Sequence, residues 1–454
     1  MQALLSFDQA PPFGAPARFF LTAPLFAILA GLLLLWSGPG LFASRWTPEA
    51  LALTHLITVG FMLQVMLGAM LQILPVVAGA NMARPRLLAT LVHLAITLGA
   101  LLLAAGFLGL QPLAFRLAAL FLGSGVALFV GSAGHALYGV PPSRATIRGL
   151  QISLLGLSVT VALGVLLAIA LDGALDLPLP RVTSIHFSWG FVGWGLVLLA
   201  AVGFVVVPMF QMTPAYPAWF THLLPWSALA LLSLWSLAEA ADWPAPSALL
   251  AGALLLITAT FAVLTLHLQR RSKRARFDAT QHYWRVGMLC TLAACTLWLV
   301  ARGLPERMAA LAERLEWLCG VLLLCGGFMS VIIGMLYKIF PFLVWLHLQN
   351  LGGGRVLAPN MNKVIAGQQI KRQMRAHFLA LALLLAAVIW PEWFTYPAGI
   401  ALLVANGALL RNLLAAVAFY RQQRTKIAAL IAAATSSDGK PSLTSHPATK
   451  APAP

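Results

Sequence analysis

The stretch THLITVGFMLQVMLGAMLQILPV, residues 54–76, decides how the whole chain is interpreted. It is almost wholly apolar and exceeds the roughly 20 residues of α-helix that cross the hydrocarbon core of a bilayer. It also carries His55 and three methionines. An imidazole is costly to bury in lipid unless it has a partner. The segment therefore predicts a transmembrane helix whose histidine is satisfied by a metal or by a neighbouring helix.

The composition extends this prediction to the rest of the chain. Of 454 residues, 61% are hydrophobic and 9% are charged, and no soluble fold could cover so much apolar surface with polar groups. Backbone groups in lipid must pair within their own segment, so the spans are helices. We expect an all-α polytopic membrane protein with twelve spans, centred in residues 19–38, 50–78, 87–109, 113–138, 148–171, 183–210, 218–240, 245–268, 283–303, 315–345, 376–392 and 396–420.

The formal net charge of +17 follows the topology of these spans. Most lysines and arginines fall in the loops after helices 2, 4, 8, 10 and 12, including the run from Arg270 to Arg276. Such loops face the cytoplasm, which predicts that both termini are cytoplasmic. The bilayer, and not nucleic acid, is then the expected partner. Residues 432–454 are rich in Ser, Thr, Pro and Ala and predict a disordered cytoplasmic tail.

Three of the predicted helices share a repeat of 133 residues, which relates Gly60, Gly193 and Gly326 and also Pro75, Pro208 and Pro341. Small residues allow close helix contact in membranes, and proline kinks or ends a helix. We therefore predict three four-helix units around a pseudo-threefold axis, with helices 2, 6 and 10 in equivalent places. The units cover about residues 19–180, 183–313 and 315–420 of a single transmembrane domain, residues 1–420.

Two of these helices contain sequence segments that are similar to those of a known family. Residues 55–76 and the segment IHFSWGFVGWG, residues 185–195, followed by PMFQMTPAYP, residues 208–217, resemble the catalytic subunit I of haem–copper oxidases and nitric oxide reductases. They look closer to its short, divergent members, the cytochrome-oxidase-subunit-I-like proteins near the NnrS family. The resemblance implies the bacterial inner membrane, haem b or copper as cofactor, and partners among haem- or copper-handling proteins or respiratory complexes.

The resemblance also points to particular ligands. His55 matches the position that ligates the low-spin haem, and His186 matches the position that ligates copper. His93, about two turns inside helix 3, is a third candidate for cofactor binding. Met62 and Met66 lie within about 20° of His55 on an uninterrupted α-helix, and thioethers with an imidazole suit cuprous copper. The plainer interpretations are hydrogen-bonded histidines and methionines that fill helix interfaces.

The ligand set of the family is incomplete in this sequence. Val321 occupies the helix-10 position equivalent to His55, and His222 stands alone where the family has a histidine pair. We therefore predict a haem- or copper-binding protein without a complete oxidase or nitric oxide reductase centre. It would act in haem or copper handling, or in the response to nitric oxide or redox stress; as an enzyme it would be a redox protein. The alternative is a cofactor-free transporter or permease, suggested by the repeats and the Gly- and Pro-interrupted spans.

Overall fold

The computed structural model describes residues 10–109, 113–141, 145–353 and 356–438, and within these residues all regular structure is helical. In this part of the chain twelve spans are long and apolar enough to cross a membrane, which confirms the predicted all-α polytopic fold. Short helices η2 (Gly38–Ala43), η5 (Glu306–Met308) and η7 (Met361–Lys363) lie next to the spans. In chain order the spans contain α1 (Gly14–Ser37); α2 (Pro48–His55), η3 (Leu56–Leu63) and α3 (Gln64–Ala78); α4 (Pro85–Phe107); α5 (Leu113–Tyr138); α6 (Ala145–Leu171); α7 (Leu179–Ser188), η4 (Trp189–Leu196) and α8 (Val197–Gln211); α9 (Ala218–Ala240); α10 (Pro244–Arg270); α11 (Ala279–Gly303); α12 (Ala309–Val321), η6 (Leu322–Met329) and α13 (Ser330–Gly352); α14 (Gly367–Ile389); and α15 (Pro391–Asp438).

Spans 2, 6 and 10, here called the lead helices, each change from α to π geometry over eight residues. The π segments η3, η4 and η6 begin 133 residues apart, and in each the repeated glycine is the fifth residue. The repeated prolines lie inside the α-helices that follow. The repeat seen in the sequence is therefore matched by a repeat in backbone geometry. Short π segments inside α-helices are rare and are frequently found at functional sites.

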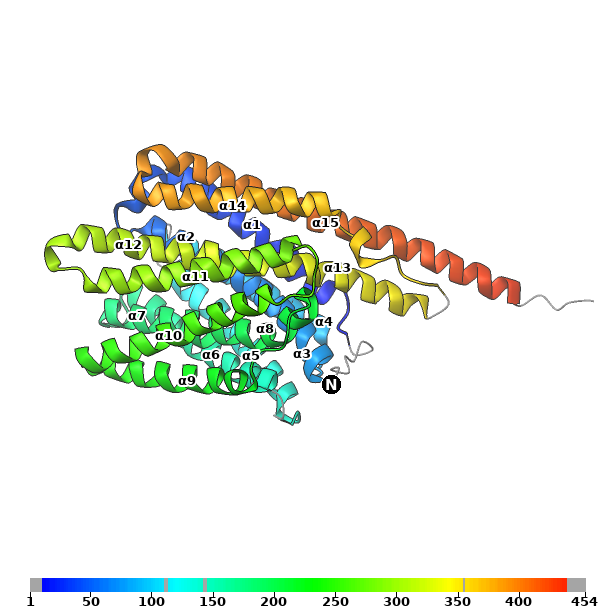
Figure 1. Ribbon diagram of the computed structural model, residues 1–454, viewed down its shortest axis with the longest axis horizontal. Helices are drawn as coiled ribbons and strands as arrows, with labels where there is room; N and C mark the ends of the chain where they lie inside the picture. The colour runs from blue at the N-terminus through cyan, green and yellow to red at the C-terminus, as the bar shows by residue number, and fades with distance from the viewer. Residues whose placement is uncertain (1–9, 110–112, 142–144, 354–355, 439–454) are drawn as a thin grey trace, which may run out of the picture.

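The lead helices occupy the centre of the bundle. Their most apolar windows are 78%, 61% and 61% buried, whereas those of α6 and α10 are each 22% buried. The π segments meet there, since η3 contacts η6 and Phe191 of η4 stacks on Phe328 of η6 with ring centroids 5.8 Å apart. The remaining helices lie around this centre (Figure 1). They carry many large apolar side chains that are exposed.

The surrounding helices pack in the same pattern three times. Helices α4, α5 and α6 contact one another in order, and α6 then packs on η4 and α8. In the same way α9, α10 and α11 lead to η6 and α13, and α14, α15 and α1 lead to η3 and α3. Figure 1 shows α1 beside α14 and α15 along one side of the bundle. Helix α1 thus completes the unit that begins with helix 10, and not the first unit, in which the range 19–180 had placed it.

Glycines allow neighbouring helices to approach the π segments closely. A Cβ atom on Gly60 would lie 2.3 Å from the ring of Phe26, and one on Gly326 would lie 2.7 Å from the sulfur of Cys290. A Cβ on Gly156 of α6 would lie only 2.2 Å from the carbonyl oxygen of Gly193 in η4. The repeated glycines therefore serve close helix approach, as small residues do in membranes.

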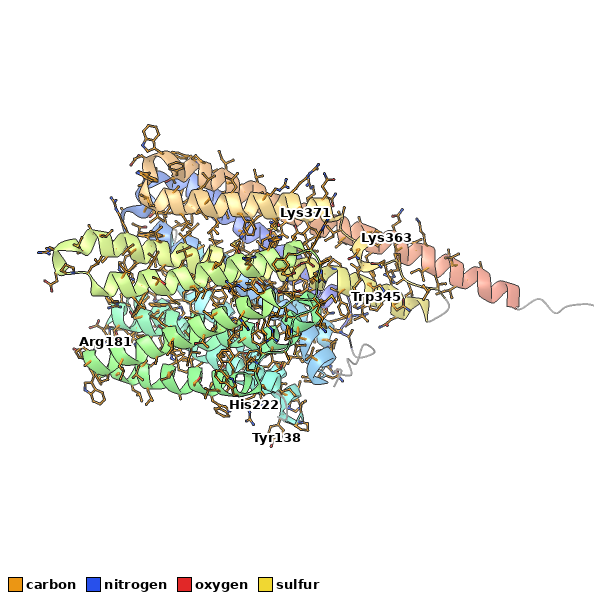
Figure 2. All side chains as sticks on the ribbon, in the orientation of Figure 1. Tyr138, Arg181, His222, Trp345, Lys363 and Lys371 are labelled. Atoms are coloured by element: carbon orange, nitrogen blue, oxygen red, sulfur yellow. The ribbon has the colours of Figure 1, made fainter. Side chains whose placement is uncertain are left out.

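Most lysines and arginines in the loops between the spans lie at one end of the bundle. An even number of spans returns the chain to the end where it began, and Lys363 and Lys371 lie at that end while Arg181 lies at the opposite one (Figure 2). The positive-inside rule predicts that the end with the two lysines is cytoplasmic.

An acidic residue fastens the loops at the basic end. Asp278 caps α11 by accepting from the amide of Gln281, and its carboxylate also binds Lys338 at 2.7 Å and Arg274 at 2.8 Å. Burial raises the pKa of Asp278, but the hydrogen bond and charge of Lys338, with the Gln281 amide and the charge of Arg274, hold it below its ordinary value. Arg274 also donates to the carbonyl of Phe210, so this carboxylate joins the ends of lead helices 6 and 10.

The last helix is longer than the sequence suggested. Helix α15 continues to Asp438 and runs past the end of the bundle (Figure 1), so the predicted disordered tail does not begin at 432. The alanine-rich segment IAALIAAA, residues 427–434, explains the difference, because alanine has the highest helix propensity. Residues 439–454 lie outside the described part of the chain.

Candidate functional site

His55 is the last α-helical residue before the first π segment. Its Nδ1 lies 2.8 Å from the carbonyl oxygen of Leu51, one turn back along the same helix. The ring stacks on Phe107 of α4, with centroids 5.0 Å apart and planes 30° from parallel. Because a carbonyl can only accept, Nδ1 carries the proton, and in the neutral ring Nε2 keeps the lone pair.

His186 has the same arrangement on lead helix 6. It lies in α7, two residues before the helix ends at Ser188, and its Nδ1 donates to the carbonyl oxygen of Thr160 on α6 at 2.9 Å. Gly164, one turn further along α6, leaves room for the ring, since a Cβ there would lie 3.0 Å from Cε1 of the imidazole. Nε2 is again the nitrogen with the free lone pair.

The two histidines occupy corresponding places on different lead helices: His55 directly precedes η3, and His186 lies two residues before the end of α7, which η4 follows. Within the described residues, Nε2 of neither ring has a hydrogen-bond partner. A histidine that binds a metal almost always has its other nitrogen held by a carbonyl or carboxylate, which fixes the tautomer and the ring orientation. Both rings meet that description.

His93 lies at another level of the bundle. It is 14 residues before Phe107 on the same helix, which places it about 21 Å along the axis from the ring that stacks on His55. Its Nε2 is 2.8 Å from the hydroxyl of Thr22, and its ring meets the edge of Phe19. His93 therefore cannot share a metal with His55, and a cofactor role for it would need a separate site.

Met62 and Met66 do not keep the alignment with His55 that an α-helix predicts. Residues 56–63 form a π-helix, whose wider i→i+5 turns admit an extra residue. Each extra residue rotates the following side chains by about 100° relative to an α-helix. The alignment within about 20° is therefore wrong. Both methionines are buried in the central apolar cluster, and copper ligation by them stays a prediction without geometric support.

His377 is a buried histidine, although the predicted span 376–392 placed it at the end of a helix. It is 1% exposed, and its Nε2 lies 2.8 Å from the hydroxyl of Ser330, the residue that follows the third π segment. That hydroxyl donates to the carbonyl of Cys325, so it accepts the Nε2 proton, and Nδ1 is buried without a partner in the described structure. Lys371, Arg372 and Arg375 made this segment resemble a loop, but α14 begins at Gly367 and places His377 ten residues inside the helix.

Other polar side chains near His377 pair with one another between helices. Tyr283 donates to the side-chain carbonyl of Gln373, and Asn412 donates to the hydroxyl of Tyr337 at 2.9 Å. All four are 3% exposed or less. Buried polar groups paired in this way fix how α11, α13, α14 and α15 pack. The pairing explains why these polar residues are buried, and no ligand is needed to explain it.

The arrangement limits the kind of group that the site could hold. No three His, Cys, Asp or Glu side chains in the described residues are placed to hold a metal ion together. Comparison with known proteins finds no matching family model and no curated protein that matches at a significant level. The site offers two half-buried imidazoles, each with an oriented Nε2 that has no partner in the described residues, on two lead helices of a multi-pass membrane protein.

Proposed function

We propose that this protein binds a haem, or failing that a copper ion, through Nε2 of His55 and His186. One observation carries the proposal: two imidazoles, each just before the π segment of a different lead helix, have Nδ1 held by a backbone carbonyl and Nε2 free. Both side chains are half-buried, and Nε2 of each is an acceptor that meets no donor in the described residues. Both rings accordingly have one unmet hydrogen-bonding capacity that a metal could satisfy.

The donor set fits haem better than a protein-built copper centre. A porphyrin supplies four nitrogens, so haem iron needs only one or two protein ligands, and histidine is among the usual ones. A copper centre with three protein ligands has no counterpart among the described His, Cys, Asp and Glu side chains. A cuprous ion held by the two imidazoles is the form of copper that this donor set allows.

The residues of this chain would hold and shield the group. His55 and His186 would ligate it, the carbonyls of Leu51 and Thr160 would keep the rings in the required tautomer, and Phe107 would cover one face of His55. When bound, haem or copper would supply one-electron redox chemistry and affinity for small diatomic ligands. Haem or copper handling, or a part in the response to nitric oxide or redox stress in a bacterial inner membrane, is the role that fits best.

An optical spectrum of protein purified from haem- and copper-replete cells, oxidised and reduced, tests the proposal together with metal analysis. We expect a haem spectrum, or copper, in the wild type and its loss in His55→Ala and His186→Ala. The matched control is His282→Ala, which removes an exposed histidine at the start of α11 and should leave the cofactor in place. Wild-type protein that carries neither haem nor copper refutes the proposal.

A cofactor-free transporter is the second candidate, and the three π segments favour it. Transporters use interrupted helices near the middle of the membrane to bind substrate, and here all three lead helices depart from α geometry where they meet. Under this alternative His55→Ala and His186→Ala would lower the free energy of unfolding, and no variant would alter the spectrum or the metal content.

A further inference from the structure

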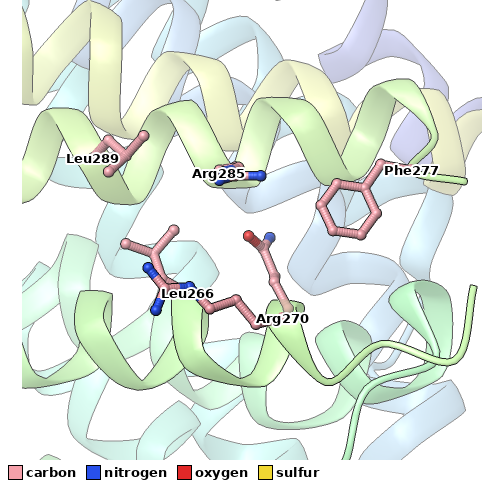
Figure 3. A pocket seen from close by; sticks show the side chains of 6 residues that line it. Leu266, Arg270, Phe277, Arg285 and Leu289 are labelled. Carbon is pink, nitrogen blue, oxygen red and sulfur yellow. The ribbon is translucent and has the colours of Figure 1, made fainter.

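A small pocket lies between the ends of α10 and α11, beside the basic loop that joins them. Its volume is about 50 Å³, and it is lined by Leu266, Gln269, Arg270, Phe277, Arg285 and Leu289. Figure 3 shows Leu266 and Arg270 on one helix facing the pocket opposite Arg285 and Leu289 on the other, with Phe277 from the loop at one end. The pocket is far from His55 and His186 along the bundle, because it lies at the end that carries the basic loops.

Two positive charges line this pocket without a negative one. The ion pairs of the described residues include neither Arg270 nor Arg285, and no acidic side chain is among the lining residues. Asp278, the nearest carboxylate in the sequence, is already bound to Arg274 and Lys338. Two like charges on facing helices repel unless an anion lies between them, and paired arginines favour the oxygens of a phosphate.

The apolar lining extends from the charged end toward the middle of the membrane. Arg285 follows the first residue of α11 by six positions, a rise of about 9 Å, and its exposed side chain can reach back to the head-group level as arginines near helix ends do. Leu289, one turn deeper, is 50% exposed, and Val263 on α10 is 52% exposed. A ligand with a charged head and an apolar tail matches this order of side chains.

A buried amide adds a polar feature to the pocket. Gln269 is 2% exposed, and its Nε2 donates to the side chain of Gln211. Its Oε1 is buried and has no hydrogen-bond partner in the described structure. This oxygen could accept a hydrogen bond from a ligand that carries a hydroxyl group beside its phosphate.

We propose that this pocket binds an anionic phospholipid, with its phosphate between Arg270 and Arg285, a head-group hydroxyl on Gln269, and an acyl chain along Leu266 and Leu289. Basic pockets between transmembrane helices at the cytoplasmic surface are the kind of site that such lipids occupy. Phosphatidylglycerol has both the phosphate and the hydroxyls, and is therefore the probe of choice.

Native mass spectrometry of the full chain, titrated with phosphatidylglycerol or with phosphatidylcholine, tests the site. The double variant Arg270→Gln/Arg285→Gln should weaken phosphatidylglycerol binding about 30-fold, since each arginine near the membrane surface contributes about fivefold, and should leave phosphatidylcholine binding unchanged. Arg276→Gln is the matched control, because it removes an exposed arginine of the same loop that does not line the pocket. It should retain wild-type affinity.

Two results of the lipid titration would refute the proposed lipid site. If Arg276→Gln weakens binding as much as the double variant, the attraction is that of the whole basic surface. If inorganic phosphate at millimolar concentration displaces the lipid from the wild type, the pocket binds a soluble anion.

Photo-crosslinking of the unmodified protein with a photoactivatable phosphatidylglycerol provides a measurement that needs no variant. The label should map to α10 and α11, and labelling spread evenly over the other lipid-facing helices would also refute the proposal.

Discussion

Replacing Gly156 by alanine should separate α6 from lead helix 6. The new Cβ would lie 2.2 Å from the carbonyl oxygen and 2.3 Å from the carbonyl carbon of Gly193, and 2.8 Å from the amide nitrogen of Trp194. All three atoms belong to the backbone of η4, so no side chain can rotate away. The contact is relieved only if one helix moves outward by about an ångström, which also disturbs the neighbouring contacts along α6.

The size of the effect follows from two opposing contributions. Alanine in a helix is favoured over glycine by roughly 0.5–1 kcal/mol, whereas overpacking a well-packed interior costs typically 1–3 kcal/mol and occasionally more. Because the clash is with backbone, we expect the upper part of that range, and a net loss of about 2 kcal/mol in the free energy of unfolding. Gly252→Ala is the matched control, since Gly252 is helical and a Cβ there meets no atom within 4 Å.

Unfolding in mixed micelles by increasing amounts of denaturing detergent measures this difference. Gly156→Ala should unfold at a lower detergent fraction than the wild type, and Gly252→Ala at the same fraction or a higher one. Equal unfolding free energies for the two variants would mean that α6 and η4 do not approach each other as closely as the structure has them. Gly156 and Gly193 would then not bring these two helices into backbone contact.

Three further predictions concern the site and the topology. Gly164→Ala should lower the bound cofactor per protein without removing a ligand, because its Cβ would press on Cε1 of His186; spectra at equal protein concentration, with Gly252→Ala as control, measure this. The pKa of Asp278 is held below the ordinary 3.8, so its contribution to stability is present above that pH and is lost as the pH falls through the folded-state pKa. Asp278→Asn should therefore be less stable at neutral pH and less sensitive to acid, as pH-dependent unfolding would show; an equally acid-sensitive variant would contradict this. A cysteine in place of Lys273, in a chain without other cysteines, should react with an impermeant reagent from the cytoplasmic side, and reaction only from the other side would invert the topology.

Much of the fold could be predicted from the sequence because lipid leaves a chain few choices. Twelve apolar segments must be helices, and the spacing of Gly60, Gly193 and Gly326 revealed which three spans are equivalent. The place of α1 could not be found in this way. It precedes the first lead helix in the chain, and only its contacts with α15 show that it completes the unit at the other end of the sequence.

The site was less predictable because it depends on local backbone geometry. Hydropathy and periodicity do not distinguish a π segment from an α-helix of the same composition, so the wheel that aligned Met62 with His55 used the wrong rotation. His377 was misplaced because basic residues in the first turns of α14 resemble a loop. The sequence did single out His55 and His186, although nothing in it indicated that two carbonyls would leave both Nε2 atoms free.

The departure from symmetry at the histidines bears most directly on what the centre could bind. The scaffold repeats at 133 residues, but Ser188 and Val321 stand where His55 would recur, and Leu53 and Cys319 stand where His186 would recur. The third lead helix therefore contributes no imidazole at either register. A metal that needs three histidines around the axis would require one from each unit, whereas haem needs at most two and supplies its remaining nitrogens itself. Two histidines from two of the three equivalent helices are thus a donor set that suits haem. Replacing either histidine should remove one of the two protein ligands.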